Sequence, residues 1–205
     1  MHIWNFQQQL ACFPVFSLRD IVKIFPHFQR IQLDRWVKRG YICRLKQGFY
    51  LLQGQELHEA FLFLVANKIY APSYISLEQA LKFYGFIPEE VFQLTSVSTK
   101  KTTSFRTAVG NFSYRHLHPR LFWGYQLRQF GKLKFLLAEP EKALLDYLYL
   151  RAELRTAADF LAMRFNVEAW RANSDAKKLM TYLAAFTNKS LTQRVQVFLN
   201  VLPHA

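Results

Sequence analysis

The sequence predicts an α+β fold, with a small N-terminal domain and a larger domain in which an antiparallel sheet precedes a C-terminal helical bundle. Three observations predict it. Residues 17–52 change from helical spacing of apolar residues to two short strands around a glycine turn. Residues 91–139 alternate with a period of two and are rich in β-branched and aromatic residues. Residues 140–201 return to helical spacing, and strands followed by helices are typical of α+β domains.

Composition and charge are those of a globular protein that can bind a polyanion. Of the 205 residues, 51% are hydrophobic and 20% are charged, which suffices for a sizeable core. The formal net charge of +13 favours attraction to nucleic acid. Residues 1–55 hold eight Lys or Arg against two Asp, so about a quarter of the chain carries nearly half of the net charge.

Two helices are expected before residue 25. Residues 3–10 carry apolar side chains that can pack on the helices that follow. Ser17 is expected to cap the second helix, with Asp20 three residues later as its capping-box partner. The segment Phe25-Pro26-His27 ends that helix, because proline lacks an amide hydrogen and restricts the residue before it. The apolar stripe of the second helix consists of Leu18, Ile21 and Val22.

A third helix should begin near Phe28. Leu33, Trp36 and Val37 recur at helical spacing and form its inward face. Gly40 is expected to end it with a positive φ angle. Its opposite face is polar and basic, and is formed by Gln32, Arg35, Lys38 and Arg39.

Residues 41–44 and 49–52 are predicted to form a β-hairpin, joined by a turn at 45–48 that contains Gly48. Three helices and a hairpin are the parts of a winged helix-turn-helix. Because an α-helix fits the major groove of B-DNA, we expect this domain to bind double-stranded DNA. We expect Arg35 to read a base and Lys46, at the tip of the wing, to contact phosphate. The expected DNA-binding residues are Gln32, Arg35, Lys38, Arg39, Arg44, Lys46 and Gln47.

The break Gln53-Gly54-Gln55 divides the chain into residues 1–55 and 56–205. A helix is expected at 56–67, and Ser76 should cap a second, which Gly85 ends before a loop at 86–90. The apolar face of the first comprises Leu57, Ala60, Phe61, Leu64 and Val65. Residues 71–73 should form a turn.

Five segments have strand character and should form an antiparallel sheet of four or five strands. They are residues 91–99, 103–110, 111–118, 122–130 and 132–139. Pro140 should open a central helix through Arg151 that is apolar nearly all round and therefore buried. Three further helices are expected at 157–164, 175–186 and 191–201, the last capped by Ser190.

Several classes of protein are not favoured. The two cysteines, Cys12 and Cys43, are too few for a disulfide scaffold and wrongly spaced for a zinc site, so a reduced cytoplasmic compartment fits best. The apolar runs are too short for a membrane span, and no signal peptide is visible. The sequence has no P-loop, dinucleotide-binding turn, H-E-x-x-H or G-x-S-x-G motif. We therefore expect no enzyme, no cofactor and no metal.

Six segments together resemble the AbiEi family, the antitoxins of bacterial AbiE abortive-infection systems. They are GYICRLKQGFYLL at 40–52, YISLEQALKFYGFIPE at 74–89, TSVSTKKTTSF at 95–105, FSYRHL at 112–117, FWGY at 122–125 and AEPEKALLDYLYLR at 138–151. The last four, in this order and spacing, are the more specific. The motif residues in the larger domain are Thr95, Ser96, Thr99, Lys100, Tyr114, Tyr125, Glu141, Lys142 and Asp146.

The resemblance implies a bacterial protein with two functions. Its N-terminal domain would bind operator DNA, with inverted repeats, and repress its own operon. Its C-terminal domain would oppose a nucleotidyltransferase-like toxin, with or without stable contact. The toxin should itself carry a Gly-Ser turn followed by Asp-x-Asp or Asp-x-Glu, and this chain has neither. The resemblance therefore implies the antitoxin and not the transferase.

Other interpretations stay open. Residues 99–102 form a basic, hydroxyl-rich loop that can contact phosphate or RNA, or be a solvated connection. His116 and His118 have the spacing of two side chains on one strand face, but further metal ligands are lacking nearby. Asp146 lies in an apolar helix and is either paired for structure or used against the toxin. Glu139 and Glu141 could be a carboxylate pair, although a charged helix start is commoner.

Two other functions compete with an antitoxin. The first is a winged-helix transcriptional regulator whose C-terminal domain senses a ligand or protein, which a deep pocket with convergent polar groups would favour. The second is an RNA-binding or RNA-modifying enzyme that uses the basic loop and Asp146. A nucleotidyltransferase gene next to this one would favour the antitoxin.

Overall fold

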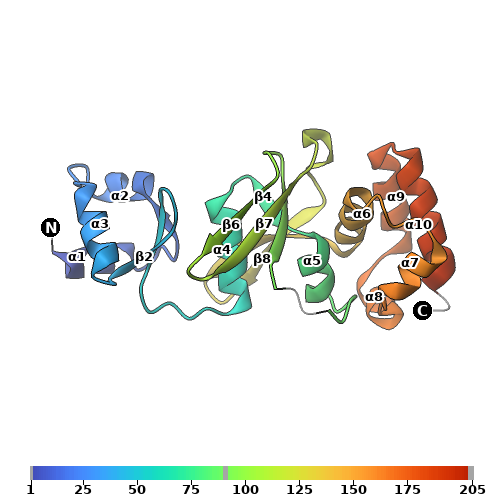
Figure 1. Ribbon diagram of the computed structural model, residues 1–205, viewed down its shortest axis with the longest axis horizontal. Coiled ribbons are helices and arrows are strands. Elements are labelled where there is room, and N and C mark those ends of the chain that lie inside the picture. The colour runs from blue at the N-terminus through green and yellow to red at the C-terminus, as the bar shows by residue number, and fades with distance from the viewer. Residues whose placement is uncertain (1, 90–91, 203–205) are drawn as a thin grey trace.

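Three helices and a three-stranded antiparallel sheet form one end of an elongated molecule, and a helical bundle forms the other (Figure 1). This computed structural model describes residues 2–89 and 92–202. Its first elements are α1 (Ile3–Leu10), β1 (Phe16–Ser17), α2 (Leu18–Ile24), α3 (Ile31–Lys38), β2 (Ile42–Lys46) and β3 (Phe49–Leu52). The small sheet has the strand order β1-β3-β2.

The ends of α2 and α3 follow from the residues that cap them. Ser17 and Asp20 form the predicted capping box, in which each side chain bonds the other's backbone N–H. Gly40 has a φ of +71° and, as predicted, ends α3, where Tyr41 N–H donates to Trp36 C=O. The prediction that α3 begins near Phe28 was wrong. Hydrogen-bonded turns occupy residues 25–30, and the helix begins at Ile31.

The hairpin is longer and tighter than expected. Strand β2 continues to Lys46, which pairs with Phe49, so the turn is only Gln47-Gly48, with a Gly48 φ of +82°. A register shift lies between Arg44 and Lys46. Leu45 is therefore buried between two more exposed cationic residues.

Two hydrophobic cores lie in the described chain, and the hairpin contributes to both. The smaller core is formed by Phe6, Leu10, Phe16, Ile21, Leu33, Trp36, Ile42, Tyr50 and Leu52. Val15, Leu45 and Leu51 instead join the larger core beyond the predicted boundary. Val22, which was expected to face the core, is 42% exposed because α2 turns only Ile21 fully inward.

The larger sheet is mixed and six-stranded, which corrects the prediction of an antiparallel sheet. Its order is β6-β7-β5-β4-β9-β8, and the pairs β5/β7 and β4/β9 are parallel. The strands are β4 (Ser73–Ile75), β5 (Leu94–Ser98), β6 (Thr103–Thr107), β7 (Gly110–His116), β8 (Tyr125–Phe130) and β9 (Leu133–Ala138). Strand β4 was missed, since Ser73 was assigned to a turn. Glu90 and Val91, in the expected loop and strand, lie outside the described residues.

Helix α4 (Glu59–Ile69) packs across strands β4, β5 and β9. Of the expected face, Phe61, Leu64 and Val65 are buried and Ala60 is partly buried, whereas Leu57 is 48% exposed because it precedes the helix. Helix α5 (Leu77–Phe83) and the buried helix α6 (Pro140–Leu150) join the sheet to the C-terminal bundle. The bundle contains α7 (Ala157–Ala162), α8 (Val167–Asn173), α9 (Ala176–Phe186) and α10 (Lys189–Val201).

Two details of the bundle differ from the predictions. Helix α8 was not expected, and Asn188, not Ser190, caps α10 by accepting a hydrogen bond from Leu191 N–H. Within residues 2–89 and 92–202, no helix is both long and apolar enough to cross a membrane.

Candidate functional site

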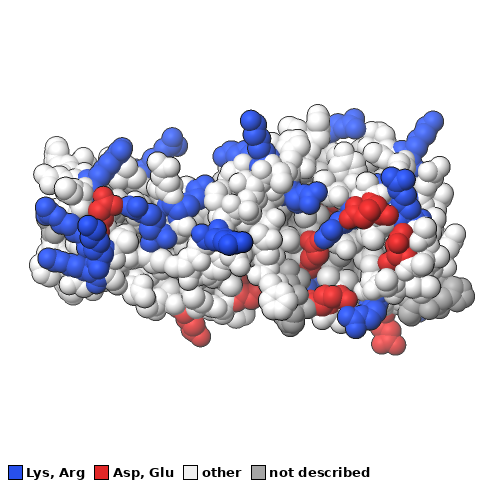
Figure 2. Space-filling model, viewed as in Figure 1, with Lys and Arg blue, Asp and Glu red and all other residues white. Residues whose placement is uncertain are grey.

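The exposed face of α3 is basic. Arg35, Lys38 and Arg39 are exposed on it, while Leu33 and Trp36 are buried on the opposite side. Lys and Arg side chains gather on this end of the molecule in the view of Figure 2. Gln32, predicted to share the basic face, is half-buried and not exposed, and its Oε1 atom is buried without a hydrogen-bond partner among the described residues. The exposed cations can approach the phosphates or base edges of a nucleic acid.

Arg44 of β2 is held beside α3 by an ion pair. Its Nη2 atom donates to Asp34 Oδ1 at 2.5 Å, and its guanidinium lies 5.5 Å from the centre of the Tyr50 ring. The hydrogen bond to Asp34 raises the pKa of Arg44. Gln47 is exposed in the turn. The ion pair therefore holds β2 of the hairpin beside α3.

Lys46 is not at an exposed wing tip, contrary to the sequence-based expectation. Its Nζ lies 4.4 Å from the centre of the Phe105 ring on β6 and 5.4 Å from that of Tyr70, both beyond the predicted domain boundary. It also lies 5.3 Å from the Phe49 ring centre. Burial and the nearby charge of Lys100 lower the pKa of Lys46. The hairpin therefore meets the larger sheet through a half-buried cation.

The loop at residues 99–102 is held at this same junction through the backbone of Lys101 and the side chain of Thr102. Tyr70 Oη donates to Lys101 C=O at 2.8 Å, and His116 N–H donates to Thr102 Oγ1 at 3.0 Å. Lys100 Nζ lies 5.4 Å from the Tyr70 ring centre. An open depression of about 650 Å³ is lined by Tyr70, Thr99, Lys100, Lys101, Thr102 and His116.

His116 and His118 make separate local contacts. His116 ends β7 with Nδ1 3.1 Å from Lys100 C=O, whereas His118 accepts a hydrogen bond from Arg120 N–H in the next turn. Among the described residues, no three His, Cys, Asp or Glu side chains are grouped to hold a metal.

Asp146 lies at the centre of a fully buried polar network. Lys142 Nζ contacts Asp146 Oδ1 one turn away on α6. Tyr74 Oη and Ser76 Oγ donate to Asp146 Oδ2 at 2.8 and 2.9 Å. Lys142 Nζ also donates to Tyr74 Oη at 2.8 Å. This arrangement satisfies both carboxylate oxygens, as the structural alternative for Asp146 requires.

Aromatic rings and a glycine enclose Lys142. Its Nζ lies 5.1 Å from the ring centres of both Trp123 and Phe186. Burial lowers the pKa of Lys142, and the carboxylate of Asp146 opposes that shift. Gly124, with a φ of +70°, passes so close that a Cβ there would lie 3.0 Å from Lys142 Cγ. The side chain of Lys142 is thus closely surrounded and fully buried.

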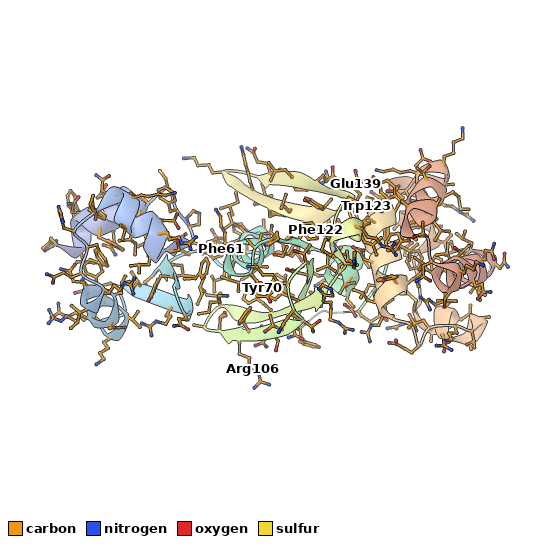
Figure 3. All side chains as sticks on the ribbon, turned by 90° about the horizontal axis from the view of Figure 1, so that it is seen from above. Phe61, Tyr70, Arg106, Phe122, Trp123 and Glu139 are labelled. Carbon is orange, nitrogen blue, oxygen red and sulfur yellow. The ribbon has the colours of Figure 1, made fainter. Side chains whose placement is uncertain are left out.

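A second group of polar contacts joins the start of α6 to α9. Tyr182 Oη contacts Glu139 Oε2, and Lys178 Nζ lies 3.1 Å from Glu139 Oε1. Glu141 is buried and accepts a hydrogen bond from Asp175 N–H at 2.7 Å. Figure 3 shows Glu139 and Trp123 close together between the large sheet and the C-terminal helices. Lys178 Nζ also lies 3.5 Å from Glu141 Oε2, so the two carboxylates share one lysine and connect the start of α6 to α9.

The other motif residues also make internal contacts. Thr95 Oγ1 accepts a hydrogen bond from Gln79 N–H and donates to Ser76 C=O, so it caps α5 in place of Ser76. Tyr114 Oη donates to Ala66 C=O, and Tyr125 stacks on Tyr74 with 4.6 Å between ring centres. Ser96 is buried, and its hydroxyl has no hydrogen-bond partner in the part of the chain that the structure describes.

The sequence-based reasoning missed Tyr70 and Trp123 as organising residues. Trp123 lies in the FWGY segment, so a signal for it was present. Tyr70 has no such signal, because its importance arises only when β2 and the loop at 99–102 meet.

Neither the scan against models of protein families nor the search of curated proteins finds a match to this chain.

Proposed function

We propose that this protein is a DNA-binding antitoxin that represses its own operon and opposes a nucleotidyltransferase-like toxin. In this proposal α1, α2, α3 and the β2–β3 hairpin act as a winged helix-turn-helix, and α3 is the recognition helix. The observation that carries it is the exposed cationic row Arg35, Lys38 and Arg39 on a helix anchored from behind by Trp36.

The charge distribution supports nucleic acid as the partner. In the face shown in Figure 2, Lys and Arg predominate from α3 toward the large sheet, and Asp and Glu gather nearer α6 and α7. A long-range field of this kind attracts a phosphate backbone and directs one end of the molecule toward it. The motif resemblance set out above supports the assignment to an antitoxin.

DNA binding is tested with the full-length chain and a duplex that contains the promoter upstream of its gene. The triple variant Arg35→Ala/Lys38→Ala/Arg39→Ala should lose most of its affinity and most of its preference over a scrambled duplex. The matched control is Arg171→Ala/Lys177→Ala/Lys189→Ala, which removes three exposed cations from the bundle. If both triple variants bind alike, α3 is not the recognition helix.

Toxin opposition is tested by co-expression of the full chain with the nucleotidyltransferase-like protein encoded beside it. The α3 triple variant should still restore growth, because its substitutions leave the larger core and the network around Asp146 intact. Loss of protection by that variant, at normal protein levels, would show that DNA binding and toxin opposition are not separate functions.

The alternative of a ligand-sensing regulator has one observation in its favour. A cavity of about 550 Å³ lies between α5, α6 and α7, lined in part by Glu78, Thr95 and Tyr147. However, Glu78 is paired with Arg151 at 2.5 Å, and Thr95 is used to cap α5. These two polar groups of the cavity are thus engaged within the protein, which favours the antitoxin proposal.

A further inference from the structure

Three lysines, Lys46, Lys100 and Lys101, lie at the junction between the hairpin and the large sheet. Lys46 comes from β2, and Lys100 and Lys101 come from the loop after β5. Among the residues that the structure describes, no Asp or Glu forms an ion pair with any of the three. Elsewhere on the hairpin, Arg44 does have such a partner in Asp34.

The geometry brings two of these cations to one aromatic ring. The Nζ atoms of Lys46 and Lys100 each lie 5.4 Å from the centre of the Tyr70 ring. The ring attracts both ammonium groups, but they repel each other, and Lys100 helps to lower the pKa of Lys46. An anion bound near both ammonium groups would offset this repulsion.

The surroundings suit the oxygens of a phosphate. The depression beside Lys100 and Lys101 includes the hydroxyl-bearing residues Thr99 and Thr102, and it is open to solvent. The neighbouring strand β6 adds an exposed arginine, Arg106, which points away from the body of the protein in Figure 3. A single small anion would leave most of these groups unused, whereas a chain of phosphates would engage several.

We propose that Lys46, Lys100 and Lys101 form a second phosphate-contact site, which binds the backbone of the same DNA duplex that α3 enters. This inference rests on the proposed DNA binding and extends it to residues outside the first 55. Because Lys46 and Lys100 come from the two parts of the chain, a phosphate held by both also fixes the hairpin against the large sheet. The bound duplex thereby bridges the two parts.

The test compares Lys100→Ala/Lys101→Ala with Lys132→Ala/Lys134→Ala in the full-length chain. Both variants remove two exposed lysines, but the control pair lies at the β8–β9 hairpin, at the opposite edge of the sheet. Folding should be preserved, because the hydrogen bonds at residues 100 and 101 use backbone atoms. The affinity of each variant is measured at several salt concentrations on a short promoter duplex and on one extended at either end.

On the extended duplex, Lys100→Ala/Lys101→Ala should lower the slope of log affinity against log salt by about two, and the control should leave it unchanged. On the short duplex both variants should match the unaltered chain. Lys100→Arg/Lys101→Arg should restore the slope.

Equal losses from both alanine pairs, or no loss from either, would overturn the second site while leaving binding by α3 intact. The second site would also be overturned if Lys100→Ala/Lys101→Ala lowered the affinity for single-stranded RNA but not the affinity for the duplex. If the unaltered chain binds no duplex, the proposed function fails and this inference fails with it.

Discussion

Lys142 and Asp146 stand one turn apart on α6 and form an ion pair from which solvent is fully excluded. Two charges removed from water are costly unless they are well paired and hydrogen-bonded. Here Tyr74 and Ser76, which lie about seventy residues earlier, complete the hydrogen bonding of the carboxylate. The pair therefore ties α6 to β4 and to the start of α5.

Asp146→Ala should destabilise the protein by about 3–5 kcal/mol, because it leaves the Lys142 ammonium buried and unpaired. The double variant Lys142→Met/Asp146→Leu should recover part of that loss, since it removes both charges. Urea unfolding monitored by circular dichroism measures both values. An Asp146→Ala protein of unchanged stability that fails to restore growth in co-expression with the proposed toxin, where the unaltered chain does, would instead identify a functional acid.

Gly124→Ala should lower stability more than Gly131→Ala. Both glycines have positive φ angles, so each substitution carries a backbone penalty of about 1 kcal/mol. Only at Gly124 would the new Cβ meet Lys142, at 3.0 Å from its Cγ; at Gly131 no atom lies within 4 Å. Overpacking typically adds about 1–3 kcal/mol. Equal losses in thermal unfolding would show that Lys142 can move aside.

Asp34→Asn should strengthen binding to promoter and scrambled DNA alike. The substitution removes the carboxylate that holds Arg44 and leaves the guanidinium available to a phosphate. The slope of log affinity against log salt should then rise by roughly one. Fluorescence anisotropy at several salt concentrations measures the change. Weaker binding would mean that the ion pair is needed to orient the hairpin.

The capping box of α2 should make the protein sensitive to acid. Burial raises the pKa of Asp20, but hydrogen bonds from the Ser17 hydroxyl and N–H and the charges of Lys68 and Lys23 outweigh it, so the pKa is lowered. A carboxyl whose pKa is lowered in the folded state stabilises the fold fully at pH values above its unfolded-state pKa, near 3.9. This stabilisation is lost as the pH falls through the folded-state pKa.

Ser17→Ala should therefore cost about 1 kcal/mol at neutral pH and less below about pH 4. The control is Ser104→Ala, which removes an exposed hydroxyl on β6. Urea midpoints at several pH values compare the two variants. A loss that does not shrink in acid would show that Asp20 does not contribute through its charge.

Local signals in the sequence predicted most of the helices. The Ser17 capping box, the Gly40 stop and the Pro140 start all act through neighbouring backbone atoms, and each is found where it was expected. The start of α3 was misplaced because tertiary contacts of the aromatic residues between α2 and α3 compete with helical spacing.

Local signals could not predict the pairing between strands that are distant in the sequence. Strand β4 is three residues long and buried on both faces, so it has no alternation to reveal it. Ile75 pairs in parallel with Leu137, and such a register leaves no trace in either segment alone. The half-burial of Lys46 likewise depends on Tyr70 and Phe105, which only the folded chain brings together.

The central position of β4 has a consequence for synthesis on the ribosome. This strand can pair with β5 early, but its other neighbour, β9, follows β5 to β8 in the chain, and Asp146 lies later still. The larger core must therefore wait for residues beyond 146, whereas all the residues of the smaller core are present by Leu52. A nascent chain would therefore contain a folded α3 before the large sheet is complete, and a prematurely terminated chain could contain α3 without that sheet. Ribosome-stalled chains of increasing length should gain the two parts in that order.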